Sequence, residues 1–148
     1  MSGVFAGVMS ASLLLASVAW AGGQKPVTYR AEVQRVVDGD TVIVSIPGWP
    51  APYSPVHVRL NGIDTPEGRM PPAKCIKEVR LAKIAKARLK SLLPPGAKVS
   101  VTWVGRPEKY GRLLATMTDQ AGRDLISMMI NDGIARPYAG GHKSDWCQ

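Results

Sequence analysis

The stretch Val56–Met70, which reads VHVRLNGIDTPEGRM, places the strongest constraint on what this chain can fold into. Its first five residues alternate apolar and polar side chains, which is typical of a half-buried strand. Pro66 has a fixed φ and no N–H, so a strand ladder cannot continue through the Asp-Thr-Pro-Glu run. The stretch therefore places Arg59, Asp64 and Glu67 where a strand leaves its sheet.

This strand end carries the chemistry of an oxygen-rich cation site. Thr65 precedes a proline, which favours an extended backbone that leaves its carbonyl free as a ligand. Carboxylates, backbone carbonyls and water are the ligands that Ca²⁺ prefers. The chain has only two cysteines and two histidines, which argues against a Cys/His zinc cluster.

The remaining pattern predicts a mainly β, α+β domain. Asp-Gly at 38–39 favours a hairpin, 47–55 is a Pro-rich loop, and 106–112 is a turn-like link. We expect strands at 27–37, 41–46, 56–60, 99–104 and 113–118, and helices at 75–93 and about 124–132, the second with Gly133 as its C′ residue. One helix between the third and fourth strands and another after the last favour a five-stranded OB-fold Greek-key barrel with two or three helices.

The longer predicted helix is amphipathic. Its apolar stripe is formed by Leu81, Ile84, Ala85, Leu89, Leu92 and Leu93. Basic residues fall on the other side, namely Lys77, Arg80, Lys83, Lys86 and Lys90. We interpret this basic side as an ordinary solvated face rather than a dedicated nucleic-acid groove.

Length and charge limit the function classes. With 148 residues the chain is expected to be a single domain with a substantial core. The 19 basic residues outnumber the 11 acidic ones and give a formal charge of +8. This excess predicts a polyanionic partner, most simply nucleic acid, although an anionic membrane surface would also be attracted.

Residues 1–21 are expected to be a signal peptide, and 22–148 the mature domain. This segment carries no charged side chain and ends in Ala19-Trp20-Ala21, a small-x-small cleavage pattern. The alternative is an uncleaved N-terminal membrane anchor, because the apolar run reaches the lower limit of a spanning length. Cleavage predicts a secreted or periplasmic protein, and Cys75 and Cys147 are then expected to pair in an oxidising compartment.

Three motifs, taken together, resemble one family. The segments 37–41 (VDGDT), 59–67 (RLNGIDTPE) and 108–112 (EKYGR) are similar in order and spacing to the motifs of the staphylococcal nuclease, or thermonuclease, family. The resemblance covers about residues 27–138 and implies an OB-type barrel. It also implies cleavage of DNA and RNA at the 5′ P–O bond to leave 3′-phosphate ends, by a monomer without a stable protein partner.

The resemblance implies a role for individual residues. Asp40, Asp64 and the Thr65 carbonyl would hold one Ca²⁺. Glu67 would position or deprotonate the attacking water, a contribution of roughly 10²–10⁴-fold when a side chain acts as a general base. The remaining residues would contact the substrate: Arg59 and Arg112 the scissile phosphate, Lys109 and Tyr110 a neighbouring phosphate, and Tyr138 the nucleotide.

Simple chemistry agrees with these roles. Phosphodiester hydrolysis builds negative charge on the phosphoryl oxygens, which a divalent cation and two guanidinium groups can stabilise. Arginine suits this task better than lysine because its planar fork bonds two phosphate oxygens at once. After Tyr138 the chain reads AGGHKSDWCQ, whereas the staphylococcal enzyme continues into another helix.

Plainer roles stay open for several residues. His57 and His142 are expected to be structural or exposed. Asp38 and Asp40 could simply form the hairpin turn, and Glu67 could cap the turn after Pro66. Arg59 could lie on a solvated strand face, and Arg112 could form a surface ion pair with Glu108. Besides a nuclease, the whole chain is compatible with a nucleic-acid-binding module without catalysis and with a structural or inhibitor-like secreted protein.

Overall fold

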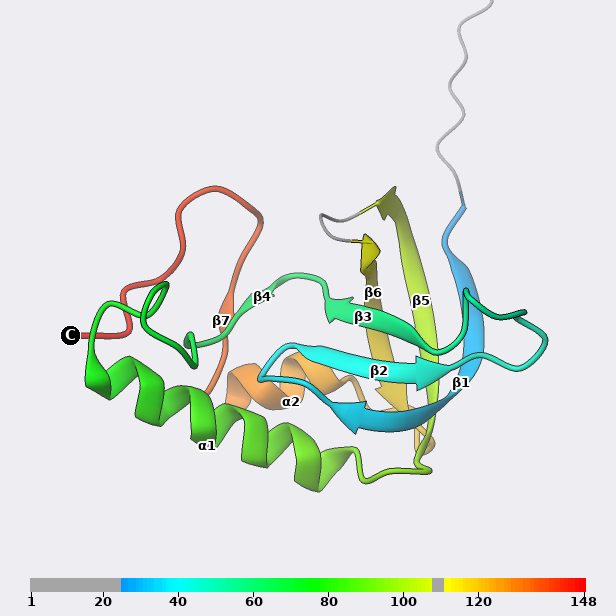
Figure 1. Cartoon of the computed structure of the whole chain (residues 1–148), viewed down its shortest axis with the longest axis horizontal. Helices are drawn as coiled ribbons and strands as arrows, with labels where there is room; N and C mark the ends of the chain where they lie inside the picture. Colours follow the sequence, from blue (N-terminus) through cyan, green and yellow to red (C-terminus); the bar gives the residue numbers. More distant parts are fainter. Residues whose placement is uncertain (1–24, 108–110) are drawn as a thin grey trace, which may run out of the picture.

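Five strands close into a barrel in the computed structural model, which describes residues 25–107 and 111–148. The barrel order is β1 (Val27–Val36), β2 (Thr41–Ser45), β3 (Val56–Leu60), β6 (Leu113–Asp119) and β5 (Lys98–Pro107). Neighbouring strands are antiparallel except β3 and β6, which pair in parallel. The predicted five-stranded OB-fold barrel is confirmed (Figure 1).

The turn-like link predicted from residue 106 does not begin there, because β5 extends through Pro107, which pairs with Leu113. The register of this pair shifts between Trp103 and Pro107, and Gly105 within the shift has a φ of 78°. An irregularity of this kind lets a strand bend and then resume its pairing. Sequence periodicity does not reveal such a resumption, because the alternation is broken at the irregularity.

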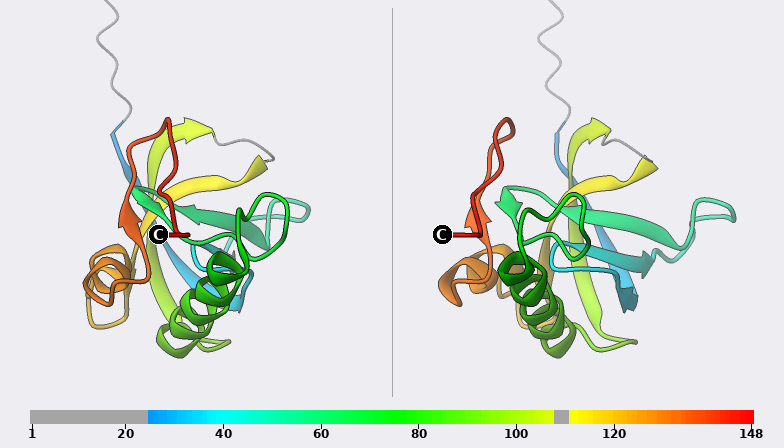
Figure 2. Two further views of the ribbon diagram at one scale, coloured as in Figure 1. Left: turned by 90° about the vertical axis from the view of Figure 1, so that its left-hand side faces the viewer. Right: turned by 60° about the vertical axis from the view of Figure 1, so that its left-hand side comes forward.

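Two helices lie across one end of the barrel and complete its core (Figures 1 and 2). Helix α1 spans Ile76–Leu92 and helix α2 spans Leu125–Asn131. The fully buried side chains include Val33, Val42, Val44, Val58, Leu60, Ile63, Leu89, Leu93, Val101, Met117, Leu125 and Met129. These side chains from the barrel interior and the inner helix faces form one core. Burial of each contributes about 1.5–3 kcal/mol to the stability of the fold.

The apolar stripe predicted for α1 is wrong at Ile84, which is 54% exposed. The face that packs on the barrel follows a spacing of four, three and four residues through Glu78, Ala82, Ala85 and Leu89. Ile84 is about 100° around the helix from Ala85 and therefore points away from the barrel. Glu78 and Ala82 lie on this buried face although neither belongs to the predicted stripe.

A two-stranded sheet outside the barrel was not predicted. Strand β4 (Ile63–Asp64) pairs with β7 (Arg136–Pro137), and the Tyr138 N–H donates to the Gly62 carbonyl at 2.8 Å. Gly133 follows α2 with a φ of 72°, as expected for a C′ residue, and turns the chain towards this pairing. Strands of two residues are too short to show alternation in the sequence.

The expected disulfide joins Cys75 to Cys147, which are 72 positions apart in the sequence. It fixes the C-terminal segment beside the loop between β4 and α1 (Figure 2). Within the described ranges, no helix combines the length and apolar character that a membrane span requires. The predicted signal peptide at 1–21 lies outside the described residues.

Candidate active site

One cavity of about 1420 Å³ opens where the β1–β2 hairpin, β3, β4 and the C-terminal segment meet. Predicted site residues that line it are Asp40, Arg59, Thr65, Glu67, Arg112 and Tyr138. Asp64 lies behind the cavity wall and is only 1% exposed. Lys109 and Tyr110 lie outside the described residues, so their predicted phosphate contact stays a prediction.

The hairpin between β1 and β2 positions Asp40. The Asp40 N–H donates to Asp38 Oδ1 at 3.1 Å, which makes Asp38 a turn residue, one of the roles left open for it. Gly39 permits a close approach, since a Cβ there would lie 3.0 Å from atoms of both Thr65 and Ala85. The Asp-Gly-Asp run therefore forms the turn and presents the second carboxylate to the cavity.

The Asp40 carboxylate is buried in a polar cluster. It accepts hydrogen bonds from Thr41 Oγ1 and Thr65 Oγ1, each at 3.0 Å, and it forms an ion pair with Arg59. Burial raises the pKa of Asp40 to about 6, although Arg59 acts to lower it. A cation beside this carboxylate would favour its charged form.

Two neighbouring strands bring the arginines together. Arg59 on β3 is paired in register with Thr41 on β2. It is only 8% exposed, so it does not lie on a solvated strand face. One terminal nitrogen donates to the Ile63 carbonyl at 3.3 Å while the other contacts Asp40. Arg112 directly precedes β6, the parallel neighbour of β3, and lines the same cavity.

The C-terminal segment holds Asp64 from behind. Asp64 Oδ2 accepts hydrogen bonds from Trp146 Nε1 at 3.1 Å and from the Ser144 N–H at 3.3 Å. Lys143 Nζ lies 3.5 Å from Asp64 Oδ1 and also forms an ion pair with Glu67. Among the described residues, Oδ1 of Asp64 is buried and has no hydrogen-bond partner.

Lys143 brings a positive charge to these two carboxylates. Partial burial acts to lower the pKa of Lys143, but the contacts with Glu67 and Asp64 outweigh it and raise the pKa. The amine therefore stays protonated at neutral pH. In the absence of a cation, its charge offsets the repulsion between Asp64 and Glu67.

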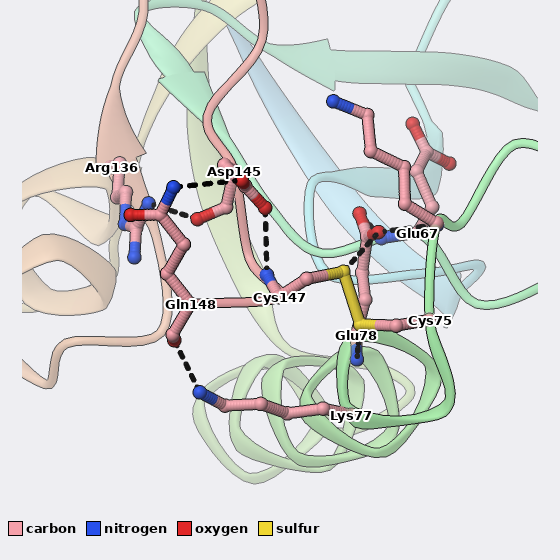
Figure 3. Close-up of a disulfide and its surroundings, with 9 residues drawn as sticks. Glu67, Cys75, Lys77, Glu78, Arg136, Asp145, Cys147 and Gln148 are labelled. Atoms are coloured by element: carbon pink, nitrogen blue, oxygen red, sulfur yellow. Dashed lines mark hydrogen bonds between the residues drawn. A yellow bond between two sulfur atoms is a disulfide. The ribbon is translucent and has the colours of Figure 1, made fainter.

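Glu67 is fixed through its backbone rather than its side chain. Its N–H donates to Glu78 Oε1 at 3.2 Å, and the Lys74 N–H donates to Glu78 Oε2 at 2.8 Å. Glu78 is 5% exposed and its Oε2 lies 4.0 Å from the Cys147 sulfur, a packing contact because a disulfide sulfur carries no proton (Figure 3). The Glu67 carboxylate faces the cavity and Lys143, so a turn cap does not describe its side chain.

The sequence interpretation missed Glu78, Lys143 and Trp146. Glu78 stands three residues after the helix N-cap Cys75, a spacing typical of a capping box, and this signal could have identified it. For Lys143 and Trp146 the sequence gives only indirect evidence of a place in the site. The expected disulfide implied that the tail returns to the start of α1, close to the strand-end carboxylates.

The donor set fits a hard cation. Asp40, Asp64 and the Thr65 carbonyl supply oxygen atoms, and the buried Oδ1 of Asp64 has capacity for a further partner. Among the described residues, no group of three or more His, Cys, Asp or Glu gathers as a metal cluster. A cation held here would therefore depend on two carboxylates, a carbonyl and water.

Most of the charged side chains in the cavity lining are basic. Lys83 and Lys86, which the sequence placed on an ordinary solvated face, line the cavity together with Arg69. With Arg59, Arg112 and Lys143 they give one cavity an excess of positive charge. His57 and His142 are both exposed and lie outside its lining, as expected for histidines without a catalytic role.

Two comparisons with known proteins agree on the family. Residues 57–145, more than half of the chain, match the family described as "Staphylococcal nuclease homologue". The chain is also 33% identical over 114 residues to Endonuclease YhcR of Bacillus subtilis (strain 168), which covers 74% of this chain and 9% of that protein. The chain thus spans less than a tenth of the length of this relative.

Proposed function

The chain belongs to the staphylococcal nuclease family, and from this membership we propose that it is a Ca²⁺-dependent nuclease. The proposed reaction is hydrolysis of DNA and RNA at the 5′ P–O bond, which leaves 3′-phosphate ends. The observation that carries the proposal is a single basic cavity lined by Asp40, Thr65, Glu67 and two arginines.

The proposed cation ligands are Asp40, Asp64 and the Thr65 carbonyl. A divalent ion held by them supplies Lewis-acid stabilisation of the charge that develops on the phosphoryl oxygens. The choice of Ca²⁺ rests on donor chemistry, because all protein donors are hard oxygens and two of them are carboxylates. The Thr41 and Thr65 hydroxyls and Arg59 hold Asp40 in place.

Arg59 and Arg112 are the proposed phosphate-binding residues. Arg59 cannot rotate freely, because one nitrogen bonds the Ile63 carbonyl and another pairs with Asp40. A guanidinium fixed in this way is preorganised for a trigonal-bipyramidal phosphorus and needs no reorganisation during the reaction. Arg112 reaches the cavity from the adjacent strand and binds the phosphate from a second direction.

Glu67 is the proposed water-positioning residue. Its side chain is 32% exposed at the cavity wall, and its backbone is held by Glu78. A carboxylate in this place accepts a hydrogen bond from the attacking water or takes its proton, and the oxygen not paired with Lys143 is available for this. Lys83, Lys86 and Arg69 extend the basic wall and would attract the flanking phosphates of a polynucleotide.

We also propose that the protein acts outside the cytoplasm. The expected signal peptide at 1–21 and the disulfide between Cys75 and Cys147 support this location, since structural disulfides persist in oxidising compartments. N-terminal sequencing of the exported protein should give Gly22 as the first residue. An intact N-terminus in the membrane fraction would support the membrane anchor instead.

The decisive test is to incubate the purified protein with single-stranded DNA and RNA in Ca²⁺ or in a chelator. Cleavage should require Ca²⁺ and yield 3′-phosphate and 5′-hydroxyl ends. Asp40→Asn serves as the matched control, since it keeps the shape of a proposed ligand and removes its charge. Tight binding of nucleic acid without cleavage in Ca²⁺ would favour a binding module, and full cleavage in chelator would exclude the cation role.

A further inference from the structure

We propose that Trp146 is a positioning residue of the cation site: its indole N–H orients Asp64 so that Oδ1 is directed to the cation. This proposal rests on the proposed function, because it takes Asp64 as a cation ligand. It assigns the C-terminal segment 143–147 to the active site, although this segment lies beyond the motif residues that predict the site.

The two oxygens of Asp64 have different surroundings. Oδ2 accepts two hydrogen bonds, from Trp146 Nε1 and from the Ser144 N–H. Oδ1 is buried and accepts no hydrogen bond from the described residues, and Lys143 Nζ lies 3.5 Å from it. The tail therefore occupies one oxygen and leaves the other for a positively charged group. A carboxylate held in this way presents one defined oxygen rather than rotating between several poses.

Several contacts immobilise Trp146 itself. Its side chain is 5% exposed, and the guanidinium carbon of Arg136 lies 4.1 Å from the centre of its ring. Arg136 Nη1 also donates to the Asp145 carbonyl at 2.8 Å. The next residue, Cys147, is covalently joined to Cys75 at the start of α1 (Figure 3). The indole N–H thus has little freedom to leave Asp64.

The placement of Trp146 has a clear chemical consequence. Groups that hydrogen-bond a metal ligand fix its orientation, and their loss typically weakens metal affinity by about 10–100-fold. The indole is a donor only, so it interacts favourably with the charged form of Asp64. A purely apolar core role for Trp146 would require only the ring, whereas the positioning role requires the N–H.

The test separates the ring from its N–H. Trp146→Phe keeps a buried aromatic ring and removes the donor. In calorimetric titration of the purified protein with Ca²⁺, without substrate, the Kd should rise roughly 10-fold. Trp49→Phe is the matched control, because Trp49 packs edge-on against Tyr29 at 5.1 Å in a distant loop, and it should leave the Kd unchanged. Melting temperatures of both variants report any loss of folding.

The variant Asp64→Asn shows whether a negative result disproves the role of Trp146 or the cation site itself. If Asp64→Asn leaves the Ca²⁺ affinity unchanged, Asp64 is not a ligand and the proposed site is wrong. If Asp64→Asn weakens binding but a folded Trp146→Phe does not, the positioning role is overturned and Trp146 is a core residue. A loss in Trp146→Phe equal to that in Trp49→Phe would overturn the proposal as well.

A measurement on the unaltered protein covers the case in which Trp146→Phe does not fold. The ¹⁵N-labelled indole N–H of Trp146 should change its chemical shift as Ca²⁺ binds, because its acceptor then shares charge with the cation. The indole signal of Trp49 should stay in place. Binding of Ca²⁺ without a shift at Trp146 would contradict the proposal.

Discussion

The two walls of the cavity are built differently. On the barrel wall, Asp40 and Arg59 come from adjacent positions of the β1–β2–β3 meander, where a ladder of backbone hydrogen bonds sets their register. On the tail wall, Glu67 lines the cavity and Asp64 lies behind it, and a C-terminal segment far away in the sequence contacts both. A two-residue strand pair and a disulfide attach that segment to the rest of the fold.

Because the two walls are built differently, they should differ in their resistance to local unfolding. The barrel wall shares the cooperative stability of the core, since its backbone lies in the closed sheet. The tail wall has few backbone hydrogen bonds and opens at a lower free energy, as segments with sparse contacts generally do. Loss of a contact made by the C-terminal segment should therefore lower stability and cation affinity, whereas replacing an arginine of the barrel wall should lower turnover with little change in stability.

The largest expected effect concerns the bond that closes the tail wall. Replacing both cysteines, Cys75→Ser with Cys147→Ser, opens a loop of 72 positions. In the loop-entropy model this lowers the free energy of unfolding by roughly 4 kcal/mol. Denaturant unfolding measures the loss, and a Ca²⁺ titration should show weaker binding because Trp146 is released. Equal stability of the two proteins would show that the tail is held without the disulfide.

The next effect concerns the barrel wall. Arg59→Lys and Arg112→Lys keep the charge but replace a planar fork with a single point, and each should lower kcat by roughly 10²–10³-fold. Ca²⁺ affinity should change little in Arg112→Lys, which serves as the control for Arg59→Lys, because Arg59 lies beside the proposed ligand Asp40. Steady-state kinetics at saturating Ca²⁺ measures this. Near wild-type turnover in both variants would remove these arginines from the reaction.

Local sequence patterns were sufficient to predict the barrel. Alternating or β-rich runs, the Asp-Gly hairpin signal and the apolar stripe of the long helix predicted five strands and that helix, and the structure contains them. The bend at Gly105 and the β4–β7 pair were missed, because an irregular strand and a two-residue strand have no period. The exposed Ile84 was misplaced because its spacing fits a helical stripe while only a narrower face packs on the barrel.

The site was predicted unevenly for the same reason. The resemblance carried by the three motifs assigned Asp40, Arg59 and Arg112 to one site, and all three line the cavity. The tail contacts depend on where a Gly-rich chain returns after β7, and a turn with Gly140 and Gly141 at positive φ has many accessible paths. The disulfide was expected, but the sequence does not give the path of the tail that leads to it. The contact between Trp146 and Asp64 could therefore not be predicted.

A smaller effect is expected at Glu67 on the tail wall. Glu67→Gln removes the charge and the proton acceptor but keeps the shape, so kcat should fall by roughly 10²-fold. Its backbone anchor to Glu78 remains, and the melting temperature should therefore stay close to the wild-type value. Affinity for a nucleic-acid ligand should hold or rise slightly. An unchanged kcat in the folded variant would exclude Glu67 from water activation.

The smallest effect is expected at Lys143. Its replacement should strengthen Ca²⁺ binding, whereas Trp146→Phe and the loss of the disulfide should weaken it. The Lys143 ammonium contacts Glu67 and lies near the free oxygen of Asp64, so it must move aside when a cation binds there. Its side chain is 47% exposed, and exposed ion pairs contribute only about 0.2–1 kcal/mol. Lys143→Met should therefore tighten Ca²⁺ binding by about fivefold at most.

Calorimetric titration with Ca²⁺ should be run on two separate variants, Lys143→Met and Trp146→Phe. Comparing the two Kd values tests whether the tail wall acts through specific side chains. Both residues lie in the same short segment, so a general loosening of the tail would weaken Ca²⁺ binding in both variants. Opposite changes would show that one tail residue competes with the cation while the other orients its ligand. Weaker binding in Lys143→Met would instead mean that the ammonium is needed to hold Glu67 and Asp64 together.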